Sequence, residues 1–191
     1  MAATWKTRLA PVLLAALCTT AACSKGEETD TAAATMDDGT QTLAAALGSN
    51  DDLDMLRKAI DQSELGGVFE GPASYTILAP NDAAFEALGE DGSALFEDAQ
   101  RPMLVAILRD HLLPGHLTPE AIAESIDRNG GPVTMTSLGE SEVTFAKSGD
   151  TITVSAGDGA PAKISGTAIA ANNGVVIPLD TVLLPASEAG A

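Results

Sequence analysis

The sequence has few of the residues from which enzymes usually build an active site. Its 191 residues include two histidines, His111 and His116, and two cysteines, Cys18 and Cys23. It contains no Gly-x-Ser-x-Gly elbow, no His-Glu-x-x-His, no Cys-x-x-Cys and no Walker-type phosphate loop. No pair of acidic residues can be singled out by its spacing as a general acid and base. We therefore expect a protein without catalytic activity, cofactor or metal ion.

Aromatic and basic residues are scarce as well. Aromatics make up 3% of the chain, so aliphatic residues and alanine must fill the core. Ten Lys and Arg stand against 27 Asp and Glu, and two of the ten, Lys6 and Arg8, lie in the first 22 residues, which hold no acid. The remainder carries 8 basic residues and a net charge of −19. Such a surface repels the phosphates of nucleic acids and anionic lipid headgroups, and it fits a cationic partner, a divalent bridge or solubility alone.

The first 22 residues have the pattern of a secretory signal peptide. Lys6 and Arg8 precede the short apolar run Leu9–Leu17, and small residues stand directly before Cys23. A basic start, an apolar middle and a small-residue cleavage site define such a peptide. The run is too short to span a bilayer. We expect residues 1–22 to be removed on export.

Cys23 would then be the first residue of the mature chain and its one thiol. The residues before it resemble a bacterial lipobox, with Thr20 where leucine is usual. We predict that Cys23 carries a lipid that holds the protein on a membrane, whereas a cut by an ordinary signal peptidase would leave a secreted protein. By resemblance to known sorting rules, Ser24 favours the outer membrane, so the expected location is the cell envelope.

The next segment, residues 23–40, is rich in acid and has almost no large apolar residue. It cannot bury enough surface to fold, and we predict a disordered tether that spans about 20–25 Å. The expected domain covers residues 41–186, and residues 187–191 form a short tail.

Within this domain, helical patterns come first and strand patterns follow. Spacings of three and four predict helices from Thr42 and over Leu53–Ile60, Asn81–Ala87, Arg101–Leu113 and Glu120–Ile126, with one strand, Tyr75–Leu78, among them. Alternation predicts strands at Val133–Thr136, Val143–Ala146, Thr151–Val154, Lys163–Ala171 and Val175–Leu184. This order predicts an α+β fold and not a doubly wound parallel sheet.

Two local features carry further expectations. Proline cannot donate to a sheet ladder, so the strand that holds Pro178 should lie at an edge or be bulged there. Asn50–Asp54 is similar to the start of a calcium loop, but Met55 stands where such a loop needs glycine. We interpret that segment as a solvated helix start.

Three segments resemble the signature segments of the fasciclin family. The first is Tyr75–Leu88, a strand followed by Ala-Pro-Asn-Asp and a helix. The second is Leu108–Gly115, with Asp110-His111 at its centre, and the third is Asn173–Pro185, with Asn-Gly, an aspartate and Leu-Leu-Pro. They occur in the family's order, and together they resemble a bacterial fasciclin-domain lipoprotein. The resemblance implies N-terminal helices packed against a twisted β-sandwich or wedge.

The motif residues are expected to be mainly structural. Pro80 and Asn81 should end a strand and cap a helix, Gly174 should form a turn, and Asp180 should accept hydrogen bonds from neighbouring backbone N–H groups. His111 should be hydrogen-bonded beneath the domain surface. The motif residues considered are Pro80, Asn81, Asp82, Phe85, Asp110, His111, Asn173, Gly174 and Asp180.

The chain departs from the family pattern at two positions: Asp110 replaces the aromatic residue before the histidine, and Ile177 stands where a histidine is usual. The resemblance implies a cell-adhesion or protein-interaction module whose partner is a protein or a matrix component. The alternative is a carrier of a small apolar ligand, a pigment or a lipid. The integrin binding that is associated with the aromatic-histidine segment is not carried over, because the aromatic residue is missing.

Overall fold

The strands with the longest apolar runs form the centre of the molecule. The computed structural model describes residues 35–37 and 39–184. In it, β2 (Tyr75–Pro80) pairs in parallel with β9 (Gly174–Leu179) inside a five-stranded sheet of order β1-β8-β9-β2-β3. All six residues of β9 and five of the six in β2 are buried. Such runs are typical of strands that are covered on both faces.

The remaining strands flank this pair or form a second sheet. The first sheet is completed by β1 (Thr35–Asp37), β3 (Leu112–Pro114) and β8 (Ala168–Ala171). The second sheet is antiparallel and consists of β4 (Val133–Thr136), β5 (Glu142–Ser148), β6 (Thr151–Ala156) and β7 (Ala162–Lys163). The two sheets form the sandwich that the family resemblance implies.

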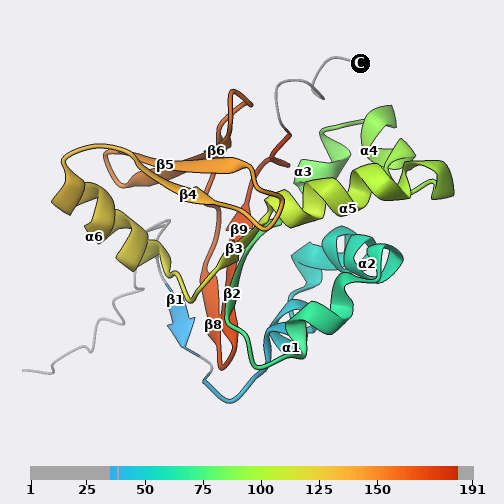
Figure 1. Ribbon diagram of the computed structural model, residues 1–191, viewed down its shortest axis with the longest axis horizontal. Coiled ribbons are helices and arrows are strands. Elements are labelled where there is room, and N and C mark those ends of the chain that lie inside the picture. The colour runs from blue at the N-terminus through green and yellow to red at the C-terminus, as the bar shows by residue number, and fades with distance from the viewer. Residues whose placement is uncertain (1–34, 38, 185–191) are drawn as a thin grey trace, which may run out of the picture.

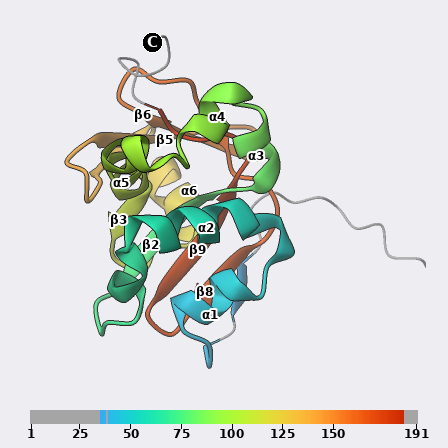
Figure 2. The same ribbon diagram turned by 90° about the vertical axis from the view of Figure 1, so that its right-hand side faces the viewer.

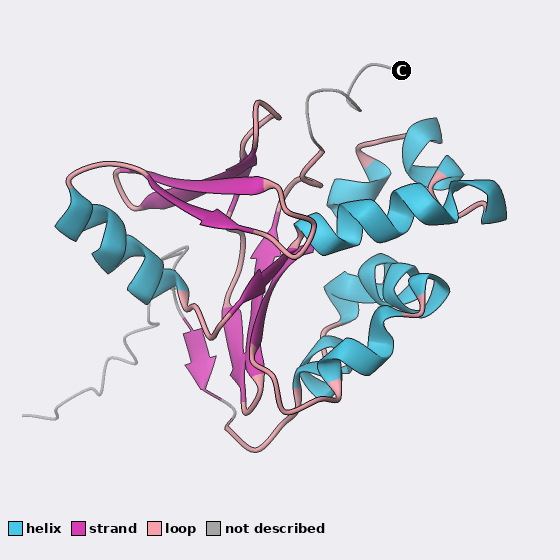
Figure 3. Ribbon diagram, in the orientation of Figure 1, coloured by secondary structure: helices cyan, strands magenta, loops and turns pink. Residues whose placement is uncertain are grey.

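Helices cover the free face of the first sheet, as Figures 1 and 3 show. They are α1 (Leu43–Gly48), α2 (Asp54–Ser63), α3 (Asp82–Glu86), α4 (Glu90–Ala94) and α5 (Arg101–Asp110), joined by the 3₁₀ turns η1 (Asp51–Leu53), η2 (Leu65–Phe69) and η3 (Asp98–Gln100). In Figure 2 this helical layer faces the viewer, with β8 and β9 behind α1 and α2. The last helix, α6 (Pro119–Asn129), lies on the other side beside the second sheet.

The central sheet separates two apolar cores. In β2, Ile77 and Ala79 pack in the helical core and Leu78 packs against the second sheet. In β9, Val176 packs in the helical core while Ile177 faces the second sheet. Successive side chains of a strand point to opposite faces, so one sheet serves both cores. The α+β class and the packing of N-terminal helices on a sandwich are confirmed.

Several predicted boundaries are wrong. The helix expected to reach Leu113 ends at Asp110, and Leu112–Pro114 pairs with β2 as β3. The strand expected over Lys163–Ala171 is two strands in different sheets, separated by a turn in which Gly166 has φ +76°. The strand expected to reach Leu184 ends at Leu179. In each case, pairing with a distant segment decides where the local pattern stops.

The expectation that the strand of Pro178 lies at an edge or is bulged there is also wrong, because β9 is an inner strand and its register with β2 runs unbroken through Ala79↔Pro178. β9 has a neighbour on each side, but its last pair with β8 is Ile169↔Val176. Pro178 lies two residues beyond that pair, and its carbonyl accepts a hydrogen bond from the Ser165 N–H at 2.9 Å. Its missing donor therefore interrupts no pairing with β8.

Part of the predicted tether is ordered. Thr35–Asp37 pair in parallel with Ala168–Ala170, and Thr35 Oγ1 donates a hydrogen bond to Glu120 Oε2 at 2.7 Å. Residues 1–34, with the predicted signal peptide and Cys23, lie outside the described residues, as do residues 185–191 with the predicted tail. Within the described residues, no helix has the length and apolarity needed to cross a membrane.

Candidate functional site

The first and last signature segments lie side by side at the centre of the fold. Tyr75 pairs with Gly174 and the register continues to Pro80 opposite Leu179, about a hundred residues apart in the sequence. The middle segment, at the end of α5, runs into β3 on the other side of β2. All three segments therefore meet around one strand, and this junction is the site that the sequence singles out.

Asn173 connects the start of β9 to two distant parts of the helical layer. Its Oδ1 accepts a hydrogen bond from the Leu43 N–H at 2.7 Å, at the first residue of α1. Its Nδ2 donates to the carbonyls of Phe69 at 2.8 Å and Gly71 at 3.3 Å. One amide side chain thus satisfies backbone groups of three residues.

Gly174 serves close packing and not the expected turn. It is the first residue of β9, and a Cβ built on it would lie 2.1 Å from the Tyr75 carbonyl oxygen and 3.0 Å from Leu43 Cδ2. Neither β2 nor α1 could approach a larger residue this closely. Glycine is required here because it has no side chain.

Asn81 and Asp82 fix the helix that follows β2. Asn81 Oδ1 accepts a hydrogen bond from the Ala84 N–H at 2.8 Å, which is the predicted N-cap of α3. Asp82 lies in the first turn of α3, as predicted. It also connects α3 to α2, because its Oδ1 accepts a hydrogen bond from the Met55 N–H at 2.8 Å. Pro80 ends β2 as expected, and Phe85 is buried with its ring centroid 6.0 Å from that of Phe96.

His111 is buried, with 1% of its surface exposed, and both ring nitrogens are engaged. Nδ1 lies 2.8 Å from the Ile107 carbonyl oxygen, and the Leu183 N–H donates to Nε2 at 3.0 Å. A carbonyl can only accept and an N–H can only donate, so the ring is the neutral tautomer protonated on Nδ1. Burial lowers the pKa of His111 from its ordinary value of 6.5, against the opposing effects of the Ile107 carbonyl and the Asp110 carboxylate. The predicted structural role agrees with this geometry.

Asp110, in the place of the family's aromatic residue, anchors the turn between β4 and β5. Its Oδ1 accepts a hydrogen bond from Ser137 Oγ at 3.1 Å, and both residues are buried. The Ser137 hydroxyl oxygen in turn accepts from the N–H groups of Gly139 and Ser141. Sequence reasoning missed Ser137, since nothing near it in the chain indicates a partner 27 residues away.

Asp180 has the predicted role at the far end of β9. Its Oδ1 accepts from the Lys163 N–H at 2.7 Å and from Thr181 Oγ1 at 3.0 Å. This contact holds β7 of the second sheet against the end of the central strand. The motif residues thus act as connections between layers.

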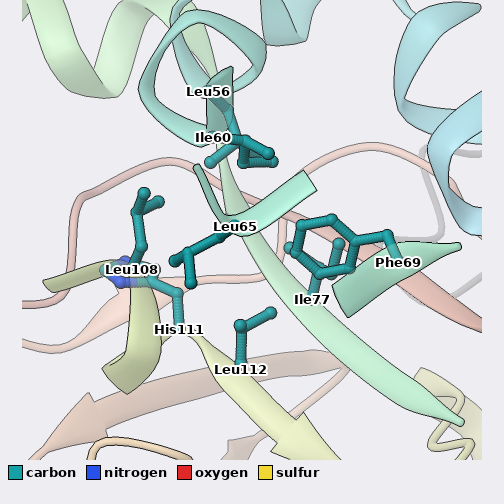
Figure 4. A pocket seen from close by; sticks show the side chains of 8 residues that line it. All are labelled: Leu56, Ile60, Leu65, Phe69, Ile77, Leu108, His111 and Leu112. Carbon is teal, nitrogen blue, oxygen red and sulfur yellow. The ribbon is translucent and has the colours of Figure 1, made fainter. Parts of the chain in front are cut away.

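An apolar cavity lies beneath the junction, between α2, η2 and β2. Figure 4 shows the side chains around it, among them Leu56, Phe69, Ile77 and His111. Its volume of about 10 Å³ is that of a single water molecule. A pigment or a lipid would need the helical layer to move apart.

The described residues bring no further reactive groups together. Within residues 35–37 and 39–184, no group of three or more His, Cys, Asp or Glu side chains is placed so that it could hold a metal ion. The Asn50–Asp54 segment is the expected helix start, with Asn50 Oδ1 accepting from the Asp52 N–H as the cap of η1. The second histidine, His116, is exposed, with Nε2 3.3 Å from the Ala171 carbonyl oxygen.

Comparisons with known proteins agree with the signature segments. The model of the fasciclin domain matches residues 51–185. The chain is 29% identical over 149 residues to the pig (Sus scrofa) transforming growth factor-beta-induced protein ig-h3, a match that covers 78% of this chain and 20% of that protein. Among solved structures it is similar to a fasciclin domain pair from the insect cell adhesion molecule fasciclin I, with a TM-score of 0.68 at 14% identity.

The structural match covers 78% of this chain and 52% of the domain pair. At this identity it shows the fold alone. The chain therefore spans about a fifth of the curated relative and about half of the solved pair, and what the similarity supports is one domain.

Proposed function

The chain belongs to the fasciclin family, and we propose that it is an adhesion or protein-interaction module, held at the cell envelope by a lipid on Cys23. Its partner would be a protein or a matrix component. The insect relative is named as a cell adhesion molecule, which supports the adhesive role. The signal-peptide pattern and the cysteine that follows it support export and anchoring.

The observation that carries this proposal is the inward use of the polar motif residues. Asn81, Asp82, His111, Asn173 and Asp180 all bind backbone groups of the domain itself. A buried neutral imidazole with both nitrogens engaged has no lone pair left to act as a base. The motif chemistry holds the layers together, and the exposed surface of the domain remains available for contacts.

The proposal is tested by comparing cells that express the whole chain with cells that lack it. We expect stronger attachment to surfaces and stronger cell aggregation with the protein, and measurements over several surfaces and calcium concentrations separate adhesion from simple charge effects. Equal attachment under all these conditions would contradict the adhesive role.

The anchor is tested separately in the same cells. Cys23→Ser removes the thiol that would carry the lipid and should move the protein from the membrane fraction to the soluble fraction. Ser24→Ala, which keeps the thiol, is the matched control. A wild-type protein found in the soluble fraction would refute the lipid and leave the secreted alternative.

The carrier alternative has less support. The apolar cavity holds about one water, and no coloured or lipidic molecule fits it without opening the helical layer. A pigment or lipid that co-purifies with the protein in fixed proportion would restore this alternative.

A further inference from the structure

A polar pocket opens where β2 and β9 end, at the opposite end of β9 from Asn173. Four separate segments line it: the start of η1, the turn after β2, the turn between β7 and β8, and the end of β9. Its volume is about 220 Å³. We call it the end pocket; its lining residues include Asn50, Asp52, Asn81, Ser165, Thr167 and Pro178.

The two asparagines of the end pocket have fixed orientations. Asn50 Oδ1 accepts from the Asp52 N–H at 3.0 Å, and Asn81 Oδ1 accepts from the Ala84 N–H at 2.8 Å. The carbonyl end of each amide is therefore committed to a helix cap. Each Nδ2 group, with its two hydrogens, is left without a partner among the described residues. These two amide groups are donors for a ligand.

The other polar groups of the end pocket are also without protein partners. Ser165 Oγ is buried and makes no hydrogen bond to any described residue. The Asp52 carboxylate and the Thr167 hydroxyl make none within residues 35–37 and 39–184 either, and both residues are exposed at the mouth. A buried hydroxyl without a partner is unfavourable, so a ligand or a water that reaches Ser165 is stabilised there.

This combination of groups defines the class of ligand. The pocket offers two fixed amide donors, one carboxylate acceptor and two hydroxyls that can donate or accept. Neighbouring hydroxyls of a sugar ring match this set, because each of them can donate to Asp52 and accept from an amide. An arginine or lysine side chain would meet the two amide donors with donors of its own. An anionic sugar would be repelled by Asp52 and by the net charge of −17.

Leu53 and Pro178 also line the pocket, but both are buried and Leu53 has no exposed surface, so the polar groups and not an apolar face select the ligand. The volume is sufficient for one monosaccharide. We propose that the end pocket binds one neutral sugar residue of a surface or matrix glycan. This inference rests on the proposed adhesive function only for the source of that glycan.

The proposal is tested by NMR titration of the isotope-labelled mature chain, in a buffer free of glycerol and Tris. Glucose, galactose, mannose and N-acetylglucosamine are added separately, each to about 100 mM, because a single sugar residue binds in the millimolar range. At least one sugar should saturably shift the amide signals of Asp52, Asn81 and Ser165–Thr167. The absence of any such shift overturns the proposal.

Variants decide whether the pocket itself is responsible. Asp52→Asn and Ser165→Ala should each weaken binding about tenfold, since each removes a hydrogen-bonding group from the site. Asp51→Asn is the matched control, because it makes the same change of charge one residue away and Asp51 does not line the pocket. Equal effects of Asp51→Asn and Asp52→Asn would reduce the result to general electrostatics and refute the site. Asp52 is exposed and Ser165 Oγ has no partner among the described residues, so neither substitution should disturb the fold.

Two further outcomes separate this proposal from the adhesive function. N-acetyl-arginine amide serves as the cationic probe, and binding of this probe in place of the sugars would overturn the sugar assignment in favour of a basic protein segment. Cells that adhere equally well with Asp52→Asn and with wild type would refute the pocket as the contact site and leave adhesion standing. Sugar binding by the purified protein, together with cells that show no adhesion, would refute the adhesive function and leave the sugar site standing.

Discussion

Acid should destabilise this domain in part through one buried side chain, His111. The folded protein holds its ring neutral, because Nδ1 donates to Ile107 and Nε2 accepts from Leu183. A proton on Nε2 would face the Leu183 N–H, and burial already lowers the pKa of His111 below 6.5. The unfolded chain has no such restriction, and its histidine titrates near the ordinary value.

The sign of the effect follows from which state binds the proton. Below pH 6.5 the unfolded state takes up a proton that the folded state excludes, so the free energy of unfolding falls as the pH falls. The full contribution is present above pH 6.5. The slope is at most about 1.4 kcal/mol per pH unit, so between pH 8 and pH 5 the domain loses at most about 2 kcal/mol through His111.

The measurement is denaturant unfolding at pH 8 and pH 5 for wild type and for His111→Gln. Carboxylates also contribute to acid denaturation, but they cancel when the two proteins are compared. The variant should lose less stability than wild type over this range, by at most about 2 kcal/mol. His116→Gln, which removes the exposed imidazole, should behave like wild type.

Two results would refute this reasoning. One is an equal loss of stability in wild type and His111→Gln. The other comes from NMR of the imidazole nitrogens in the folded wild type, which needs no variant to fold. A His111 ring that is protonated at pH 6, or that carries its proton on Nε2, is incompatible with the hydrogen bonds described here.

The signature residues at the start of β9 give two further predictions. Asn173→Ala should lower the free energy of unfolding by about 2–4 kcal/mol, because it leaves backbone groups of α1 and η2 unsatisfied. The control is Asn172→Ala, which changes an exposed residue and should have little effect. Similar urea midpoints for the two variants would contradict this prediction. Gly174→Ala should cost about 2–3 kcal/mol in thermal unfolding, because its Cβ would lie 2.1 Å from the Tyr75 oxygen. Gly48→Ala, where nothing lies within 4 Å, is its control, and an equally stable Gly174→Ala protein would show that β2 and β9 can move apart at little cost.

Much of the local structure follows from the sequence. The α+β class, the helices around Leu53–Ile60 and Glu120–Ile126 and the strands β4, β5 and β6 were predicted, because periodicity depends on residues close together in the chain. The cap at Asn81 and the bond from Asp180 to a backbone N–H were predicted for the same kind of reason. The family could be identified because three signature segments kept their order.

The errors arose where distant segments decide the outcome. Leu112 and Leu113 fit a helix as well as a strand, and pairing with β2 selects the strand. Thr35–Asp37 have no strand pattern of their own and form a strand by pairing with the edge of β8. Asp110 and Ser137, 27 residues apart, form a buried pair that no local pattern indicates.

The amino-acid sequence alone thus determined the class of fold, the family and the residues that hold its layers together, since these depend on short-range spacing and on signature segments. Tertiary structure alone decided the tautomer of His111, the central place of Pro178 and the meeting of Asn50, Asn81 and Ser165 in the end pocket. Each of these results depends on contacts between segments far apart in the chain. Such contacts form only when the two cores close on the shared sheet.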